Sequence, residues 1–398
     1  MSSSSFPALL LSQPPAHSLL QPFYTDPEVF QRELDRIFLR SWLYVGHVSE
    51  IPKQGDYLLF RLAEESVIIV NKGEGQVAGL INVCRHRGSR ICTEARGSSK
   101  VFVCRYHGWA YQLDGKLRGA GHTGGDFDKS KYGLKQVQVR VFHGMIFINF
   151  DPHPIAFDDI ERELDEPLKP YDLAHAKVAF RQNYPIAANW KLAIENYCEC
   201  YHCAPAHPEY SVAHGRAIPR DEMLPMMTEV MGRAEACGLS KQMVLKEWKN
   251  SGGVGNDRAY DRYVLMHGHV TGSQDGRPVA PLMGTIKDYD GGTNDMHIGP
   301  MTFYLAYCDH VVVYRFTPTG LESTDCEISW LVRGDAVEGK DYDLARLKWL
   351  WDVTTVADKR IIENNADGMK SRYYEPGPYT PMEDFTRRFI EWYLDAMV

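Results

Sequence analysis

Two short segments pair a cysteine with a histidine at spacings that suit metal binding. Cys84 and His86 form a Cys-x-His pair, and Cys104 and His107 form a Cys-x-x-His pair after seventeen intervening residues. Two thiolates and two imidazoles satisfy either a tetrahedral zinc ion or a [2Fe–2S] cluster with both cysteines on one iron. Zinc fingers usually pair cysteine with cysteine and histidine with histidine. The mixed Cys–His pairs of this chain therefore favour the iron–sulfur cluster over structural zinc.

A second pair of histidines lies further along the chain. His202 and His207 are five residues apart, with Pro205 between them. Proline ends a helix, so His202 is predicted on a last helical turn and His207 on the loop that folds back. With a carboxylate, the two imidazoles would form a non-haem Fe(II) site with open positions for O₂. Glu199, three residues before His202, is predicted on the same helix face, where it would hydrogen-bond a histidine. A solvated glutamate is the alternative.

The carboxylate that would complete this site is predicted within residues 353–368. Asp358, Glu363 and Asp367 are all candidates. Asp358 falls at helical spacing with Ile361 and Ile362, which makes an inward Asp358 sterically reasonable. Spacing alone does not choose among the three carboxylates.

The elements that position these residues change character along the chain. A tail and a helix, capped by Asp26 and started by Pro27, are predicted over residues 1–45. Alternating apolar residues separated by turn residues then predict an all-β domain over 46–155. Its strands are expected at 57–62, 66–71, 77–83, 100–103, 109–113, 137–141 and 145–149.

Residues 156–398 are predicted to form a second domain that mixes helices and strands. Helices are expected at 186–201, 342–365 and 384–397, and strands at 302–306, 311–317 and 326–333. The segment 250–297 is rich in Gly and Asp with weak periodicity, which predicts a long loop or lid. The fold class is therefore α+β, with an antiparallel sheet flanked by helices in the second domain.

Composition excludes several classes of protein. The 398 residues carry 44 basic and 52 acidic side chains, a net charge of −8, which argues against binding nucleic acid or an anionic membrane. No stretch approaches the ~18–20 apolar residues that cross a bilayer. The first 17 residues lack a basic start, so we expect a disordered tail and not a signal peptide. The missing signal peptide indicates a reducing cytoplasm. Nine cysteines, odd in number and low in density, argue against a disulfide scaffold and favour metal binding by the paired ones.

With these motifs in order, the chain resembles the terminal oxygenase (α) subunit of Rieske non-haem iron oxygenases. The resemblance spans about residues 25–395. It implies a catalytic domain of the helix-grip (START-like) type. It also implies that Cys84 and Cys104 bind one iron of a Rieske [2Fe–2S] cluster, and that His86 and His107 bind the other.

The resemblance further implies a mononuclear Fe(II) held by His202 and His207. The family's third ligand has a glutamate five residues on and a glycine ten residues on. Glu363 and Gly368 stand at these distances from Asp358, which makes Asp358 the implied ligand.

Electron supply is also implied by the resemblance. The family forms homotrimers in which the carboxylate at the Glu199 position carries electrons between subunits, from His107 of one chain to His202 of the next. A separate NAD(P)H-dependent reductase is expected, because no dinucleotide fingerprint is present. Two alternatives to an oxygenase come from other classes of protein. They are a pure electron carrier and a zinc-stabilised binding protein. The carrier would leave His202 and His207 unexplained.

The segment around Glu199 indicates a substrate class. Aromatic-ring dioxygenases usually carry Asn-x-x-x-Asp here, whereas this chain has Glu195 and Glu199. It is more similar to monooxygenases of quaternary ammonium compounds such as glycine betaine, proline betaine (stachydrine) and carnitine. This similarity implies O₂-dependent N-demethylation with release of formaldehyde, with aromatic-ring hydroxylation as the alternative. Aromatic faces would hold the cation, and Tyr304, Tyr307 and Trp330 are candidates.

Overall fold

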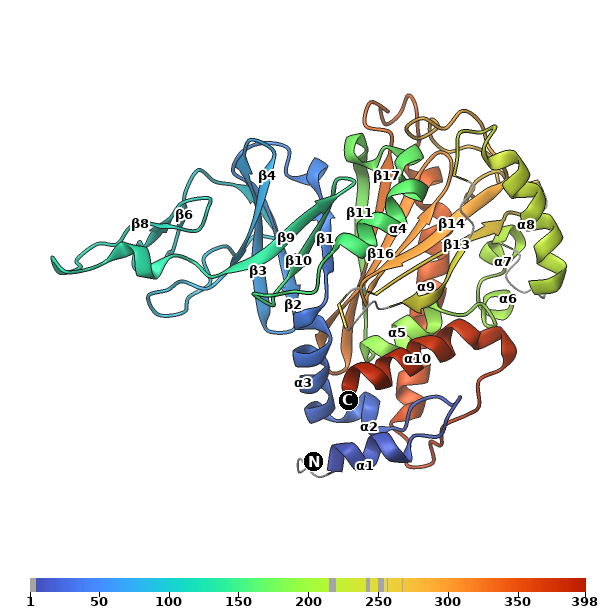
Figure 1. Cartoon of the computed structure of the whole chain (residues 1–398), viewed down its shortest axis with the longest axis horizontal. Coiled ribbons are helices and arrows are strands. Elements are labelled where there is room, and N and C mark those ends of the chain that lie inside the picture. The colour runs from blue at the N-terminus through green and yellow to red at the C-terminus, as the bar shows by residue number, and fades with distance from the viewer. Residues whose placement is uncertain (1–4, 215–219, 241–243, 250–253, 256, 267) are drawn as a thin grey trace. The chain divides into compact units, whose positions relative to one another are not determined.

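The protein is described by a computed structural model that covers residues 5–214, 220–240, 244–249, 254–255, 257–266 and 268–398. It divides into two compact units (Figure 1). The β unit comprises Tyr44–Pro154, and the mixed unit comprises Met1–Leu43 together with Ile155–Val398. In the described part of the chain, no helix is long and apolar enough to cross a membrane.

The β unit is built on a seven-stranded sheet and a three-stranded sheet. The order in the larger sheet is β1-β10-β9-β4-β3-β2-β5, and in the smaller one β6-β7-β8. Each predicted strand is present, β10 with the predicted bounds and the others with shifted ends, and three short strands (β1, β5 and β8) were not predicted. The bounds are β1 Leu43–His47, β2 Asp56–Leu62, β3 Glu65–Gly73, β4 Gln76–Ile81, β5 Arg96–Ser98, β6 Phe102–Val103, β7 Ala110–Tyr111, β8 Leu117–Gly119, β9 Gln136–Phe142 and β10 Met145–Asn149.

The mixed unit is built on one antiparallel seven-stranded sheet of order β11-β17-β16-β15-β14-β13-β12. The chain therefore contains both helices and antiparallel strands, and the predicted α+β class is confirmed. The bounds are β11 Lys177–Ile186, β12 Val244–Lys249, β13 Arg258–Val264, β14 Gly292–Ile298, β15 Thr302–Ala306, β16 Val311–Gly320 and β17 Ser323–Val332.

The predicted loop or lid over 250–297 is wrong in part, because β13 and all of β14 except its last residue lie within it. Polar residues fill buried positions on these strands and hide the apolar alternation. Arg258 is fully buried, and its Nε and Nη2 each donate to Glu163 at 2.8 Å. Arg262 is buried too and donates to Asn294 at 2.8 Å. Buried charges of this kind are tolerated only when they are paired.

Helices pack against this sheet and against one another. α5 contacts α9, and both contact strands of the sheet. Figure 1 shows that the C-terminal helix α10 and the N-terminal α1 to α3 lie in the same part of the mixed unit. The bounds are α1 Ser5–Ser12, α2 Pro22–Thr25, α3 Pro27–Arg36, α4 Asp158–Leu168, α5 Trp190–Tyr197, α6 Cys203–Ala206, α7 Pro208–His214, α8 Arg220–Ala234, α9 Leu344–Met369 and α10 Asp384–Met397.

Of three predictions about local structure, one is confirmed, one is wrong and one needs shorter bounds. The Asp26 cap is confirmed, since its side chain accepts from the Glu28 N–H at 2.7 Å. The disordered tail is wrong from residue 5 onward, because α1 forms and buries Phe6. The helix predicted over 186–201 is shorter at both ends, since Asn189 caps α5 and the helix ends at Tyr197.

A buried carboxylate fixes α5, the helix that leads into the histidine segment. Glu33 of α3 is completely buried and accepts from Lys191 Nζ at 2.5 Å. It also accepts from the indole of Trp190 at 2.7 Å and from the hydroxyl of Tyr393 at 2.6 Å. Breaking such a buried network by removing one partner costs ~3–5 kcal/mol. The network therefore holds α3, α5 and α10 in one arrangement.

Candidate metal centres and catalytic cavity

The two Cys–His segments of the β unit form two loops with the same backbone turn. In the first loop, the Cys84 N–H donates to Ser89 O at 2.9 Å, and in the second, the Cys104 N–H donates to Trp109 O at 2.8 Å. Each sulfur is therefore presented from an equivalent turn that closes on itself.

A glycine completes each turn. Gly88 has φ +80° and Gly108 has φ +72°, a region that favours glycine over residues with a Cβ. Their N–H groups donate to the carbonyls of Cys84 and Cys104 at 3.0 and 2.9 Å. The glycine after each pair is thus required by the backbone of the loop.

The sulfurs and imidazoles of these loops differ in exposure. Cys84 and Cys104 are buried, whereas His86 and His107 are exposed, with ring centroids 4.6 Å apart. Buried thiolates and outward imidazoles suit a cluster whose cysteine iron lies inside and whose histidine iron faces the surface. Trp109 stacks on His86 with centroids 4.9 Å apart and fixes the orientation of that ring.

Tyr111 is a contact of this site that the sequence did not reveal. Its hydroxyl lies 3.2 Å from Cys84 Sγ and accepts from the Arg85 N–H at 3.0 Å. Burial and the adjacent Cys84 raise the pKa of Tyr111, so the hydroxyl keeps its proton and would donate a hydrogen bond to a Cys84 thiolate. The available signal was a tyrosine in a buried strand position, since a buried Tyr hydroxyl usually finds a partner.

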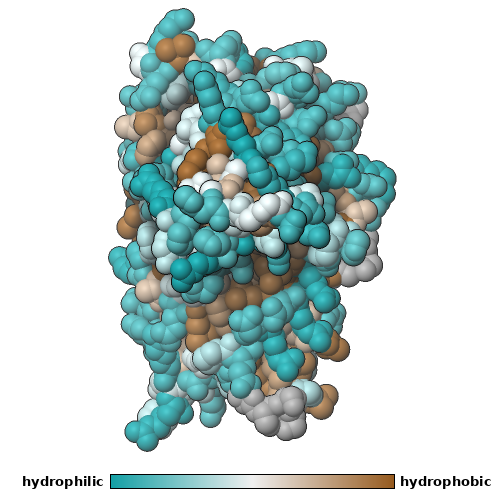
Figure 2. All heavy atoms as spheres, turned by 90° about the vertical axis from the view of Figure 1, so that its left-hand side faces the viewer, coloured by the Kyte–Doolittle hydropathy of each residue, from teal (hydrophilic) through white to brown (hydrophobic). Residues whose placement is uncertain are grey.

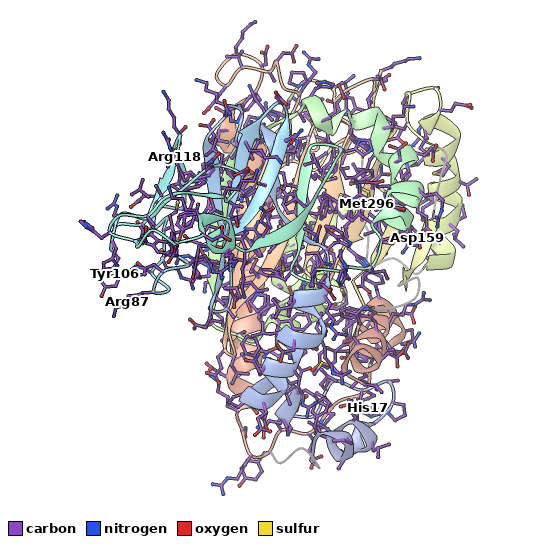
Figure 3. The ribbon with its side chains drawn as sticks, turned by 60° about the vertical axis from the view of Figure 1, so that its left-hand side comes forward. His17, Arg87, Tyr106, Arg118, Asp159 and Met296 are labelled. Carbon is purple, nitrogen blue, oxygen red and sulfur yellow. A yellow bond between two sulfur atoms is a disulfide. The ribbon has the colours of Figure 1, made fainter. Side chains whose placement is uncertain are left out.

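The two Cys–His loops of the β unit also carry a cation and an aromatic ring in contact. The guanidinium of Arg87 lies over the Tyr106 ring at 5.3 Å, and Figure 3 shows the two side chains next to each other. Tyr106 is 56% exposed. Figure 2 faces this side of the molecule, where hydrophilic residues cover most of the surface. The exposed cluster histidines are therefore flanked by a cation and an aromatic ring.

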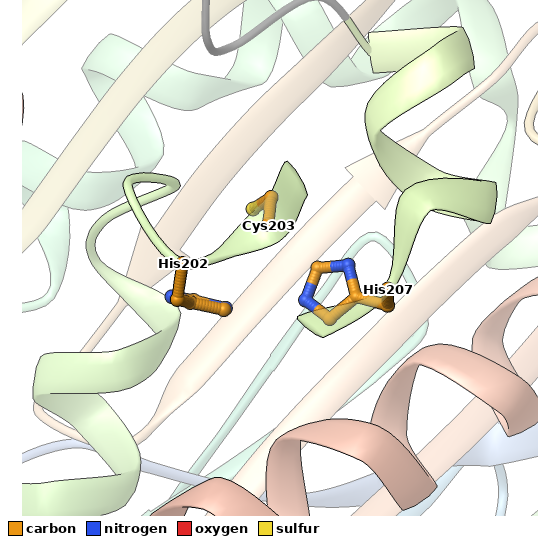
Figure 4. A group of neighbouring side chains, drawn as sticks. All are labelled: His202, Cys203 and His207. Atoms are coloured by element: carbon orange, nitrogen blue, oxygen red, sulfur yellow. The ribbon is translucent and has the colours of Figure 1, made fainter. Parts of the chain in front are cut away.

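In the mixed unit, a one-turn helix separates His202 from His207. His202 immediately precedes α6 and His207 immediately follows it, where the His207 N–H donates to Cys203 O at 3.0 Å. The imidazole centroids are 5.1 Å apart (Figure 4). The expectation that His202 lies on the last turn of the preceding helix is therefore wrong, although the two rings do lie side by side.

Asp358 of α9 reaches both imidazoles. Its Oδ1 lies 2.9 Å from His207 Nε2 and 3.2 Å from His202 Nε2. Among the described residues, both nitrogens of His207 and this oxygen are buried without a hydrogen-bond partner. His202 Nε2 lies 3.4 Å from the side-chain amide of Asn196 and faces the same space. Two imidazoles and one carboxylate that converge in this way fit a divalent metal.

The other two candidate carboxylate ligands, Glu363 and Asp367, lie away from the histidines. Glu363 accepts from the Ala187 N–H at 2.9 Å and from Lys359. Asp367 is 82% exposed at its side chain. Of the three candidates, only Asp358 is among the side chains placed beside the histidines.

Glu199 contacts His202 from the turn between α5 and α6. Its carboxylate accepts from His202 Nδ1 at 2.5 Å and from the His202 N–H at 3.2 Å, and also from the Tyr201 N–H. Since α5 ends at Tyr197, the shared helix face predicted for Glu199 is wrong. Burial lowers the pKa of His202, but the adjacent carboxylates of Asp358 and Glu199 outweigh it and raise the pKa to about 9 when no metal is bound.

A disulfide joins Cys200 and Cys203 on either side of His202. The Cα atoms are 4.9 Å apart. No disulfide was expected from the sequence, and this pair escaped notice because the odd cysteine count argued against a scaffold. The Cys203 sulfur also lies within 4.8 Å of ligand atoms of both histidines. The bridge therefore fixes the turn that presents His202.

A catalytic cavity of about 570 Å³ opens beside the three converging side chains. Its aromatic walls come from α5, α7, β16 and α9, and comprise Tyr197, Tyr210, Tyr314, Phe316 and Trp351. The predicted aromatic candidates Tyr304, Tyr307 and Trp330 are not among its lining residues. Leu305 lines the cavity, so its neighbour Tyr304 points to the opposite face of β15.

Comparisons with known proteins match both units. Residues 41–136 match the Rieske [2Fe-2S] domain, and residues 173–398 match the ring hydroxylating alpha subunit (catalytic domain). These matches favour the iron–sulfur cluster over zinc, and the catalytic domain excludes a pure electron carrier.

Curated relatives cover nearly the whole chain. The glycine betaine monooxygenase oxygenase subunit of Chromohalobacter salexigens is 39% identical over 96% of this chain and 86% of its own length. The Pseudomonas aeruginosa (strain UCBPP-PA14) protein of the same name is 38% identical over 98% of this chain and 91% of its own. The Escherichia coli (strain K12) carnitine monooxygenase oxygenase subunit is 35% identical over 48% of this chain and 52% of its own.

Solved structures share the fold. A quaternary ammonium Rieske monooxygenase in complex with L-carnitine superposes with a TM-score of 0.70 at 23% identity, over 98% of both chains. Rieske oxygenases carry a [2Fe–2S] cluster and a mononuclear iron, and the donor sets described above fit both. The chain therefore belongs to the Rieske non-haem iron oxygenases and is an oxygenase subunit with a Rieske domain and a ring-hydroxylating-type catalytic domain.

Proposed function

We propose that this protein is the terminal oxygenase of a monooxygenase system that N-demethylates a quaternary ammonium compound, such as a betaine. One observation carries the proposal: the catalytic cavity beside His202, His207 and Asp358 is walled by five aromatic side chains. A trimethylammonium group cannot donate a hydrogen bond and is held by aromatic faces. The relatives named glycine betaine monooxygenase oxygenase subunit support the same substrate class.

The proposed site roles follow from the contacts. Cys84, Cys104, His86 and His107 would hold the [2Fe–2S] cluster. When bound, the cluster supplies single electrons and the mononuclear iron supplies the O₂-dependent oxidation. The remaining steps concern what the protein's own side chains do.

His202, His207 and Asp358 would hold the mononuclear iron. Burial raises the pKa of Asp358, but the two histidines outweigh it and keep the pKa below its usual range. Asp358 is therefore ionised at neutral pH. Glu199 accepts a hydrogen bond from Nδ1–H of His202, which favours the tautomer whose Nε2 lone pair would face the metal.

The overall reaction balances as follows. Substrate, O₂, two electrons and two protons give water and a hydroxylated N-methyl group. The C–N bond of that group then breaks, which releases formaldehyde, the demethylated amine and one proton. The buried aromatic walls keep bulk water from the site during this chemistry.

Single turnover tests this function without a reductase. The protein is reduced chemically under anaerobic conditions and mixed with glycine betaine, proline betaine, carnitine or choline, or with an aromatic acid. O₂ is then admitted, and formaldehyde is measured. Formaldehyde is expected with one quaternary ammonium compound. A hydroxylated aromatic product without formaldehyde would overturn the proposal in favour of ring hydroxylation, for which benzene 1,2-dioxygenase subunit alpha of Pseudomonas putida (33% identical over 53% of this chain) is the related example.

We further propose that the protein works as a homotrimer in the cytoplasm and receives electrons from a separate NAD(P)H-dependent reductase. Glu199 would carry electrons from His107 of a neighbouring subunit to His202. Charge complementarity supports this pairing. Glu199 and Glu383 line a surface depression of about 860 Å³ beside His202, whereas Arg87 stands near the exposed cluster histidines.

Two measurements test the assembly. Analytical ultracentrifugation should give three times the 45.3 kDa chain mass. Arg87→Glu places like charges at the proposed contact, so turnover should fall steeply while the cluster spectrum persists. A monomer with full turnover would exclude electron transfer between subunits.

A further inference from the structure

Resting on the proposed function, we propose that Trp351 and Thr354 form a subsite for the anionic group of the substrate, a carboxylate. The indole N–H and the hydroxyl donate to that group while the aromatic walls hold the cationic end. The enzyme would then select zwitterionic betaines over quaternary ammonium ions without an acceptor.

Both side chains present a buried donor that lacks a protein partner. Trp351 is 1% exposed and Thr354 is 5% exposed, and both line the catalytic cavity. Trp351 Nε1 and Thr354 Oγ1 have no hydrogen-bond partner among the described residues. Leaving a buried polar group unpaired costs ~1–3 kcal/mol, so a ligand that supplies an acceptor is favoured by that amount.

A missing partner does not by itself make a site. Thr302 Oγ1 and Trp330 Nε1 are also buried without a partner in the described part of the chain. Neither residue lines the catalytic cavity. Trp351 and Thr354, in contrast, each carry an unpaired donor and belong to residues that line the cavity where the substrate is proposed to bind.

Their position on α9 sets the distance from the metal side. Trp351, Thr354 and Asp358 are separated by three and four residues, so they form one stripe along the helix. At 1.5 Å per residue, Thr354 lies about 6 Å and Trp351 about 10 Å from Asp358 along the helix axis. A small betaine with one methyl group at the metal places its carboxylate in this range.

The charges of the cavity agree with a zwitterion. Glu199 lines it near the histidines and attracts a cation, whereas a bound metal would offset the charge of Asp358. Lys359 is the one lysine or arginine among the lining residues, and it is bound to Glu363 and to the Pro185 carbonyl. Neutral donors are therefore left to receive the substrate's negative end.

Binding, and not turnover, provides the test. Glycine betaine and tetramethylammonium are titrated calorimetrically into the anaerobic holoenzyme, its Thr354→Val and Trp351→Phe variants, and the matched controls Thr302→Val and Trp330→Phe. Each variant should raise the Kd of glycine betaine about tenfold or more and leave that of tetramethylammonium within about twofold. The controls should bind both ligands like the parent. Unchanged cluster absorbance and iron content verify folding of each protein.

Several results would overturn the subsite. These are an unchanged Kd for glycine betaine in both variants, or an equal rise for both ligands, which would assign the effect to the cavity walls. Binding of tetramethylammonium but not glycine betaine by the parent would also overturn it, while leaving recognition of quaternary ammonium intact. Binding of neither ligand would refute the subsite and the proposed substrate class together.

Discussion

Glu195 provides a prediction whose size follows from its surroundings. It lies on α5, four residues before Glu199, and accepts from the Tyr24 hydroxyl at 2.8 Å. Burial and the charge of Glu383 raise its pKa to about 7, against the opposing effects of Tyr24 and Lys191. A carboxyl that titrates near neutrality makes the stability of the mixed unit depend on pH.

The size of the change in stability follows from the difference between the pKa of Glu195 in the folded protein and its ordinary pKa. A rise from 4.5 to about 7 corresponds to about 3 kcal/mol, at 1.36 kcal/mol per pKa unit. Because the folded pKa is raised, this stability is fully present below pH ~4.5 and is lost as the pH rises through ~7. Glu195 lines the surface depression beside His202, where water enters, so about 3 kcal/mol is an upper bound.

Glu195→Gln keeps the shape of the protonated side chain and removes its titration. Its stability advantage over the parent should grow by about 2 kcal/mol between pH 5 and pH 8. Urea unfolding followed by tryptophan fluorescence measures this difference at the two pH values.

Glu363→Gln is the matched control with the opposite sign. Burial raises the pKa of Glu363, but the Ala187 N–H and Lys359 outweigh it and lower the pKa below its ordinary value. That stability is present above the ordinary pKa of 4.5 and is lost only in acid. The stability difference between Glu363→Gln and the parent should therefore stay nearly constant between pH 5 and pH 8. A Glu195→Gln advantage that stays constant with pH, or a loss at pH 8, would refute the reasoning.

Three further variants test the metal centres. His202→Ala should lose the mononuclear iron and keep the cluster spectrum; loss of both, by metal analysis, would mean that the site is misassigned. Tyr111→Phe removes the hydroxyl next to Cys84 Sγ and should lower the cluster potential by on the order of 50 mV, a ~1 kcal/mol hydrogen bond converted for one electron. An unchanged voltammogram would show that this bond does not tune the cluster. Glu199→Gln should keep both metals but slow reoxidation of the cluster in stopped flow; an unchanged rate would remove Glu199 from the electron path.

The sequence predicted best what is local along the chain. The Cys84 and Cys104 loops were predictable because each turn closes within six residues, with its glycine at a fixed offset. His202 and His207 were likewise paired by spacing, although a one-turn helix lies between them. Asp358 lies about 150 residues away in sequence, so spacing could only offer candidates and the family resemblance had to choose.

The cavity walls and part of the sheet could not be predicted, for two physical reasons. Strand side chains alternate between faces, so the choice of Tyr304 over the lining residue Leu305 failed by a single position. In β13 and β14, paired polar residues such as Arg258 replace apolar ones at buried positions and erase the period of two. The face to which a strand side chain points and the pairing of a buried polar residue both depend on residues that are distant in the sequence.

The stripe on α9 constrains how this segment can change in evolution or in the laboratory. Trp351, Thr354 and Asp358 share one face only because three and four residues separate them. Inserting or deleting one residue between Thr354 and Asp358 rotates the two sides of the helix by about 100° relative to each other. Asp358 would turn away from the histidines, or the upstream donors would leave the cavity. This stretch of α9 can therefore diversify by substitution but must keep its length.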